Sequence, residues 1–282
     1  HMRKLISTIL ALCMVLCLLP VTAAADDASL PVNKWDVSSD ETYYSELVYK
    51  VDKDAIEIYA KGANQVYELT GTTDRPIRLW GGNSESESGT IYLRLNNAEI
   101  NGGIVVENSP VKLVIEVVDG TTNTLTSVSA NDLTITGAGT LKAAYLSVTQ
   151  KTRTSYMPSK LYIKDTTIVV NEPASAGDSC QWNGECVLDG SANVTYISNS
   201  DFSPLQVGVK NGDPTHSLTM KGDSKLYCLQ GVETSAYSVS GLEAFDAAIT
   251  LQDNAYLEAQ GRAASGGNVG CGVVCDGDIT VK

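Results

Sequence analysis

The stretch Asn131–Leu141, NDLTITGAGTL, decides how the rest of the chain is interpreted. Apolar and polar residues alternate in its first half, which predicts a β-strand with one buried face. Gly137 and Gly139 follow, and a Gly-Ala-Gly after a strand raises the question of a phosphate-binding loop. A dinucleotide fingerprint needs a third glycine and a following helix, and GAGTLKAA supplies neither. We therefore interpret the glycines as a corner at which the chain bends sharply between two strands.

The apolar spacing of this stretch recurs along the chain. Leu133, Ile135 and Leu141 stand at offsets 0, 2 and 8. The same offsets are found in LYIKDTTIV (161–169), VTYISNSDF (194–202), LTMKGDSKL (218–226) and ITLQDNAYL (249–257). Three further copies complete the series. IYLRLNNAEI (91–100) is one residue longer, another copy starts at residue 113, and ITVK (279–282) contains only the beginning of a copy. The copies begin 20 to 33 residues apart, a period typical of solenoids.

The repeat predicts an all-β fold. Each unit is a short strand, a turn rich in Gly, Asp and Asn, and a second short strand. The favoured architecture is a single-stranded parallel β-helix, in which the inward residues of each coil pack on those of its neighbours. A β-sandwich is the alternative, but it predicts strands every 8–12 residues or so with varied turns. It does not predict one recurring strand–turn–strand phrase.

The chain divides into four expected segments. Residues 1–25 are expected to be a signal peptide and 26–45 a flexible, polar segment. Residues 46–89 are expected to form an N-terminal cap or the first coils, because a solenoid needs its exposed end covered. Residues 90–282 are expected to form the parallel β-helix. The sequence stops within GDITVK, in the middle of a unit, so we expect the β-helix to be truncated at its C-terminus.

Three longer stretches interrupt the repeat. They cover residues 142–159, 171–190 and 232–246. We expect them to be loop insertions that project from the coils.

The first residues have the pattern of a secretory signal. A basic start and an apolar run from Leu5 to Leu19 precede three alanines, Ala23–Ala25. A membrane anchor is the alternative, but the run of about 15 residues is shorter than the roughly 20 that a membrane-spanning helix needs. We therefore expect a secreted or cell-surface protein that has no membrane contact after the signal is removed.

The charge balance narrows the classes of partner. Without the two basic residues of the signal, 18 basic residues stand against 33 acidic ones, a net charge of −15. Such a surface argues against nucleic acids and anionic membranes as partners. We expect a monomer whose partner is a polysaccharide, or a glycan or protein on a host surface.

Five cysteines follow the signal segment, and an exported protein can form disulfides. Because five is odd, at least one thiol stays unpaired within the chain. The pairs closest in sequence are Cys180 with Cys186 and Cys271 with Cys275, and these are the expected bridges. Cysteines buried as small apolar residues are the alternative.

Residues 90–141 carry a family resemblance. They contain LNNAEI, then GGIVVENSPVKLVI, DGTTNTL and LTITGAGTL, and together these resemble a family of secreted bacterial carbohydrate-binding domain-containing proteins of Clostridia and other gut Firmicutes. A looser likeness covers about 245–282, with AAITLQDNAYLEAQG and GGNVGCGVVCDGDITV. The resemblance implies a right-handed parallel β-helix like that of polysaccharide lyases, and binding of plant polysaccharide and of calcium. Residues 142–244 depart from the pattern, with longer insertions and extra cysteines.

Aromatic residues suggest where a sugar would bind. Tyr and Trp outnumber Phe, 16 residues to two, and their rings suit wet interfaces. The candidates for sugar stacking are Trp80, Tyr145, Tyr156 and Trp182. Trp182 is the strongest of these, because a Cys180–Cys186 bridge would display it.

Calcium is the expected metal. It takes six to eight hard oxygen ligands, often from loop carboxylates, and the turns of the repeat offer Asp253, Asp276 and Asp278. The alternative is that Asp and Asn favour turns because they hydrogen-bond to nearby backbone.

These observations favour a non-catalytic protein that binds extracellular polysaccharide, with calcium as an expected aid. An adhesin that binds a host protein through its loop insertions is the second candidate. A polysaccharide lyase is the third; it would need a Lys or Arg base and calcium-binding carboxylates around a groove. No arginine stands beside an acidic cluster on the repeat phrase, so we expect no catalysis.

Overall fold

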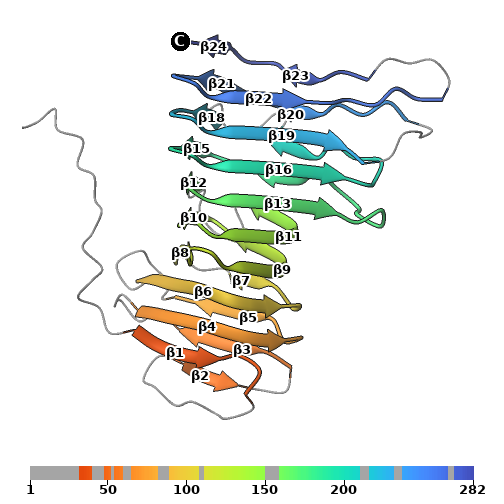
Figure 1. Ribbon diagram of the computed structural model, residues 1–282. Helices are drawn as coiled ribbons and strands as arrows, with labels where there is room; N and C mark the ends of the chain where they lie inside the picture. The colour runs from red at the N-terminus through yellow and green to blue at the C-terminus, as the bar shows by residue number, and fades with distance from the viewer. Residues whose placement is uncertain are drawn as a thin grey trace, which may run out of the picture. The chain divides into compact units, whose positions relative to one another are not determined.

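The computed structural model describes a parallel β-helix (Figure 1). It describes residues 32–39, 48–51, 54–59, 65–81, 89–107, 111–149, 159–209, 216–231, 237–265 and 270–282. These ranges contain strands, turns and bends and no helix, so none of them offers a helix able to cross a membrane. All of them belong to the unit Val32–Lys282. The expected signal peptide, residues 1–25, lies outside the described residues.

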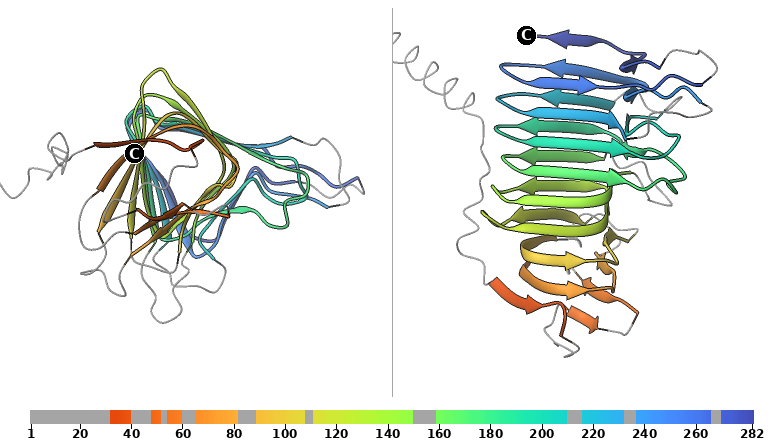
Figure 2. Two further views of the ribbon diagram at one scale, coloured as in Figure 1. Left: turned by 90° about the horizontal axis from the view of Figure 1, so that it is seen from below. Right: turned by 45° about the vertical axis from the view of Figure 1, so that its right-hand side comes forward.

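Each coil contributes strands to three parallel sheets, which Figure 2 shows end-on and from the side. The first sheet contains β1 (Val32–Asp36), the first parts of β4 (Gln65–Thr73) and β6 (Thr90–Ile100), β8 (Lys112–Val117), β10 (Asp132–Thr136), β12 (Lys160–Lys164), β15 (Glu185–Asp189), β18 (His216–Met220), β21 (Ala247–Leu251) and β24 (Ile279–Val281).

The second sheet continues each coil after one corner. It contains the later parts of β4 and β6, the first parts of β9 (Thr122–Ala130) and β11 (Thr140–Val148), then β13 (Thr167–Glu172), β16 (Asn193–Ser198), β19 (Lys225–Gln230) and β22 (Tyr256–Ala259).

The third sheet closes the coil. It contains β3 (Ile56–Tyr59), β5 (Ile77–Trp80), β7 (Ile104–Val106), the later parts of β9 and β11, then β14 (Cys180–Trp182), β17 (Leu205–Val207), β20 (Leu242–Ala244) and β23 (Val273–Cys275). The described strands pair in parallel throughout, except that β2 (Val48–Val51) pairs antiparallel with β3. This pattern confirms the parallel β-helix and is not that of an antiparallel sandwich.

The register confirms most of the predicted repeat, but in the copy 161–169 the inward residue after the corner is Ile168 and not Val169. The first residues of the copies form one column on the first sheet: Ile91, Leu113, Leu133, Leu161, Cys186, Leu218, Ile249 and Ile279. The copy assigned to Val194 is wrong, because Val194 pairs with Ile168 and Leu226 on the second sheet. The missing copy begins at Cys186, a small apolar residue that fills the column as leucine does elsewhere.

The interior of the coil stack is a continuous apolar core. Before the last coil, most inward residues of all three sheets are almost fully shielded from water, and the largest of them are Trp182, Tyr67 and Tyr196. In the last coil Ile279 and Val281 are exposed. Each inward side chain packs on the side chains at the same position of the coils before and after it. Stability therefore comes from contacts between neighbouring coils.

The segment predicted to be flexible contains a strand. Val32–Asp36 forms β1, which pairs residue by residue with β4, and the side-chain amide of Asn33 donates to the Val66 carbonyl (3.2 Å). Val37 is fully buried and Trp35 packs against the core. The polar composition of 26–45 suggested a flexible segment. An edge strand such as β1 buries only part of its side chains, so it can form from a polar sequence. The rest of 26–45, apart from 37–39, lies outside the described residues.

Strands β4 and β5 lie in the expected cap or first coils, 46–89. They pair in parallel with β6 and β7, as the later coils pair with one another. The antiparallel β2–β3 pair precedes them.

The prediction that 142–159, 171–190 and 232–246 are loop insertions is wrong for part of each stretch. These stretches contain the end of β11 and the strands β14, β15 and β20. Most of these segments belong to the third sheet. Its strands are short, and the number of residues that separates each of them from the preceding strand varies. Of the remaining described residues, 173–179 and 237–241 connect the second sheet to the third.

Gly137 and Gly139 occupy a corner between the first and second sheets, as predicted. Gly137 has a φ of +102°, and a Cβ there would lie 2.3 Å from the Val117 carbonyl oxygen of the preceding coil. A Cβ on Gly139 would lie 2.3 Å from the carbonyl oxygen of Val118. The corner is tight because two coils stack directly, and only glycine fits.

Replacing Gly137 with alanine should lower the free energy of unfolding by about 1–3 kcal/mol, because the backbone is left-handed and the neighbouring carbonyl is in contact. Urea-unfolding midpoints would measure the effect. Gly177→Ala is the matched control, since a Cβ there meets nothing within 4 Å. Equal midpoints for the two variants would contradict the corner assignment.

Candidate functional site

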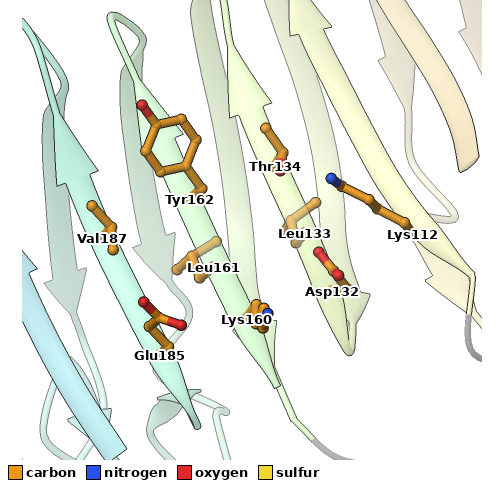
Figure 3. A pocket seen from close by; sticks show the side chains of 9 residues that line it. All are labelled: Lys112, Asp132, Leu133, Thr134, Lys160, Leu161, Tyr162, Glu185 and Val187. Atoms are coloured by element: carbon orange, nitrogen blue, oxygen red, sulfur yellow. The ribbon is translucent and has the colours of Figure 1, made fainter. Parts of the chain in front are cut away.

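A shallow groove crosses the outer face of the first sheet (Figure 3). Its volume is about 300 Å³. Outward side chains from β8, β10, β12 and β15 line it, together with two residues whose side chains are buried; the set is Lys112, Asp132, Leu133, Thr134, Lys160, Leu161, Tyr162, Glu185 and Val187. The groove therefore runs across the strands, from one coil to the next.

Strand register places four charged residues in one row of the groove. Lys112, Asp132, Lys160 and Glu185 are successive register partners on adjacent strands. Adjacent strands lie about 4.8 Å apart, so basic and acidic side chains alternate at that interval. Opposite charges on neighbouring strands stabilise one another, and the row offers both donors and acceptors to a ligand.

A second row contains the aromatic ring of the groove. Thr134, Tyr162 and Val187 are register partners, so Tyr162 stands between two smaller side chains. The hydroxyl of Tyr162 donates to Asp189 Oδ2 (2.7 Å), and Lys221 Nζ lies 3.1 Å from the same oxygen. This chain of contacts fixes the ring on the sheet surface.

The electrostatics of Tyr162 and Asp189 agree with that geometry. Partial burial raises the pKa of Tyr162, and its hydrogen bond to Asp189 raises it further. Burial alone would raise the pKa of Asp189, but hydrogen bonds from Tyr162, Lys221 and the Gly190 amide outweigh it and lower the pKa. Tyr162 therefore stays a neutral donor to an ionised Asp189 at neutral pH.

The prediction that Trp182 stacks on a sugar is wrong. Trp182 is 0% exposed, and its indole N–H donates to the Tyr196 hydroxyl (2.9 Å) inside the core. The two rings meet edge to face, with centroids 5.5 Å apart. Trp182 faces inward because its register partners, Val148 on β11 and Val207 on β17, are both buried in the core.

The two expected disulfides are absent from the described cysteines, which are all free. Cys180 and Cys186 are buried on different sheets, and their thiols point to Glu172 Oε1 and the Asn183 carbonyl oxygen, each 3.9 Å away. Cys271 is exposed and Cys275 is half-buried. Most of the short strand β23 lies between these two, and an extended chain advances about 3.3 Å a residue, too far for a bridge.

The other aromatic candidates do not lie in the groove. Tyr145 belongs to the third-sheet part of β11, where it is half-buried and packs against the core. Trp80, also half-buried, stacks on Tyr59 with centroids 6.1 Å apart. Tyr156 lies outside the described residues.

The three aspartates expected to bind calcium do not form a calcium site. Asp253 Oδ2 accepts the Gly222 amide (2.9 Å) and Asp276 Oδ1 accepts the Asp246 amide (2.7 Å). The described residues contain no group of three or more His, Cys, Asp or Glu side chains that could hold a metal ion, whereas calcium takes six to eight oxygens. The set Asp253, Asp276 and Asp278 therefore does not fit the ion.

Sequence reasoning placed Leu133 and Leu161 in the repeat but missed most of the outward residues that line the groove. Their only signal is their phase: they are the polar or aromatic positions between the inward residues of the repeat. Aligning the copies by their first residue would have placed Lys112, Asp132 and Lys160 in one row.

Comparison with known proteins adds no relative. A scan against family models gives no match, and searches of curated proteins and of solved structures also give none. The likeness of residues 90–141 to carbohydrate-binding domain-containing proteins therefore stays a resemblance.

Replacing Trp182 should act on stability. Trp182→Ala should cost about 3–5 kcal/mol, because it leaves a large cavity in the core. Trp182→Phe should cost less, about 1 kcal/mol for the lost hydrogen bond plus a smaller loss of packing. Denaturant unfolding followed by circular dichroism would measure both. A Trp182→Ala protein with unchanged stability would contradict the buried placement.

The cysteines should differ in their reaction with a maleimide. Burial raises the pKa of Cys180 to about 12 and raises those of Cys186 and Cys228 further, and the thiolate is the reactive form. Peptide mapping by mass spectrometry should find Cys271 modified in the folded protein and these three only in denaturant. Labelling of Cys186 in the folded protein would be inconsistent with the structure.

Proposed function

We propose that the protein is secreted and binds extracellular polysaccharide, without cleaving it, in the groove on the first sheet. The observation that carries the proposal is the combination of one ring, Tyr162, with an alternating row of charged side chains on a rigid sheet. A sugar ring offers an apolar face and a rim of hydroxyls, and Tyr suits such a mixed surface. The charged row supplies acceptors and donors for the hydroxyls.

The arrangement favours an extended ligand. The groove crosses four strands, and each strand is held by backbone hydrogen bonds to both neighbours. A surface that does not reorganise loses little entropy on binding. A polymer chain lying across the strands would meet the charged row and the ring together.

Binding fits the groove better than cleavage. Glycoside hydrolysis uses two carboxyl groups on either side of one bond. Asp132 and Glu185 are the acids of the groove, and Lys160 lies between them in the row. Calcium has no part in the proposal, because the expected ligands do not fit it.

A second candidate function is an adhesin. Phe202 (38% exposed) and Tyr237 (66% exposed) lie on connections between the second and third sheets. Exposed rings on loops are common contacts at protein interfaces. These connections would meet a host protein on a surface separate from the groove.

Replacing Tyr162 with alanine should weaken polysaccharide binding about tenfold or more, as expected for loss of a central aromatic contact. A soluble glycan panel followed by calorimetry would identify a ligand and measure its affinity. Tyr256→Ala is the matched control: Tyr256 is 46% exposed on β22 of the second sheet, away from the groove.

Three outcomes can be told apart. Selective loss of binding in Tyr162→Ala supports the groove. Equal loss in both tyrosine variants would reject the groove as the site. Binding to no glycan, with capture of a host protein that Phe202→Ala abolishes, would favour the adhesin.

A further inference from the structure

Glu172 places a carboxyl group inside the coil stack. It ends β13, its side chain is 1% exposed, and its register partner in the next coil is Ser198. Among the described residues only Glu172 and Arg262 are both charged in type and buried. Arg262 Nη2 lies 3.0 Å from Asp201 Oδ1, whereas no Lys or Arg of the described chain forms an ion pair with Glu172.

Hydroxyl groups take the place of a cation at Glu172. Ser198 Oγ donates to Oε2 (2.8 Å), and Ser200 Oγ lies 3.3 Å from the same oxygen. The Cys180 thiol is 3.9 Å from Oε1. Three neutral donors satisfy the carboxyl oxygens but do not balance a full negative charge, which is costly to bury without a cation.

The neighbouring ionisable groups do not supply the missing positive charge. Asp178, on the loop before β14, adds repulsion; Tyr145 of β11 and Cys180 of β14 are neutral when protonated. The buried Arg262 is engaged with Asp201. Burial raises the pKa of Glu172, the hydrogen bonds from Ser198 and Ser200 oppose this, and Asp178 raises it again; the net shift is upward.

Glu172 also holds the start of the loop 199–204. Its carbonyl accepts the Asn199 backbone amide (3.3 Å) and the Asn199 side-chain amide (2.8 Å). Ser200 Oγ, which contacts the carboxyl, accepts the Phe202 amide (3.2 Å). The carboxyl therefore contacts the start of the loop that carries the exposed Phe202, through the hydroxyl of Ser200.

We propose that Glu172 is a proton-dependent latch, which holds the loop 199–204 closed while its carboxyl is neutral and releases the loop when it ionises. An ionised carboxylate must gain water, and moving the loop that carries Ser200 would admit water without breaking the strand pairing. The surface that bears Phe202 would then differ between acidic and more alkaline surroundings. The latch is independent of the groove.

The direction of the effect follows from linkage. A carboxyl whose pKa is raised on folding binds its proton more tightly in the folded state. Its stabilising contribution is complete below the pKa of the unfolded chain and is lost as pH rises through the pKa of the folded state. Loop closure should follow the same direction.

Hydrogen exchange of the full chain, read by mass spectrometry at several pH values and corrected for intrinsic exchange, tests the latch. The amides of Asn199 and Phe202 should lose protection about tenfold or more as Glu172 ionises. Glu172→Gln, a neutral isostere, should keep their protection at every pH. Glu185→Gln, which changes an exposed glutamate of the groove, should behave like the wild type.

Ser200→Ala supplies a second test that does not depend on Glu172→Gln folding well. Its hydroxyl favours the ionised carboxyl, so its loss should move loop opening to higher pH. Identical pH dependence in wild type and Glu172→Gln would overturn the proposal, as would protection that does not change with pH. A shift of Ser200→Ala to lower pH would overturn it as well.

Discussion

In-register parallel pairing between successive coils is the constraint on which the rest of the structure depends. Because strand side chains alternate between faces, a slip of one residue would turn a coil's apolar set outward. Leu133 must therefore align with both Leu113 and Leu161, and the backbone pairs on either side hold it there. The same register builds the core on the inside and places rows of polar side chains on the outside. The coils differ in length, and the extra residues lie in the connections between strands.

The sequence predicted the first sheet well because its signal is local. Each copy of the phrase contains two inward residues two apart and a third after the corner, all within one short stretch. The third sheet gave no comparable signal: β14 and β17 have three residues each, with two inward positions such as Leu205 and Val207. The connections before these strands vary in length, so no fixed offset marks them. A pattern of leucine, isoleucine and valine also excludes Cys186, although its side chain fills the same position in the column.

The candidate site could not be predicted from the sequence, for a different reason. Its residues come from four strands that are separated in the chain, and only the register brings Lys112, Asp132 and Lys160 side by side. Residue type was a poor guide to exposure: Trp182 stands in a segment with glycine and cysteine that resembles a loop, yet it is buried. Whether a ring faces the core or solvent depends on the phase of its strand, and for β14 that phase is set by its partners β11 and β17.

The acidic residues of the corners are of a type that suits calcium binding, and the same carboxylates also suit hydrogen bonding to backbone amides. Asp165 and Asp253 adopt positive φ, a conformation that aspartate tolerates better than most residues. Asp165 Oδ1 accepts the Ser191 amide of the next coil (2.8 Å), as Asp253 and Asp276 accept amides of the coil before. A carboxylate near a corner satisfies a backbone N–H that strand pairing does not reach. These acids therefore act within the coil stack, as acceptors that tie one coil to its neighbour.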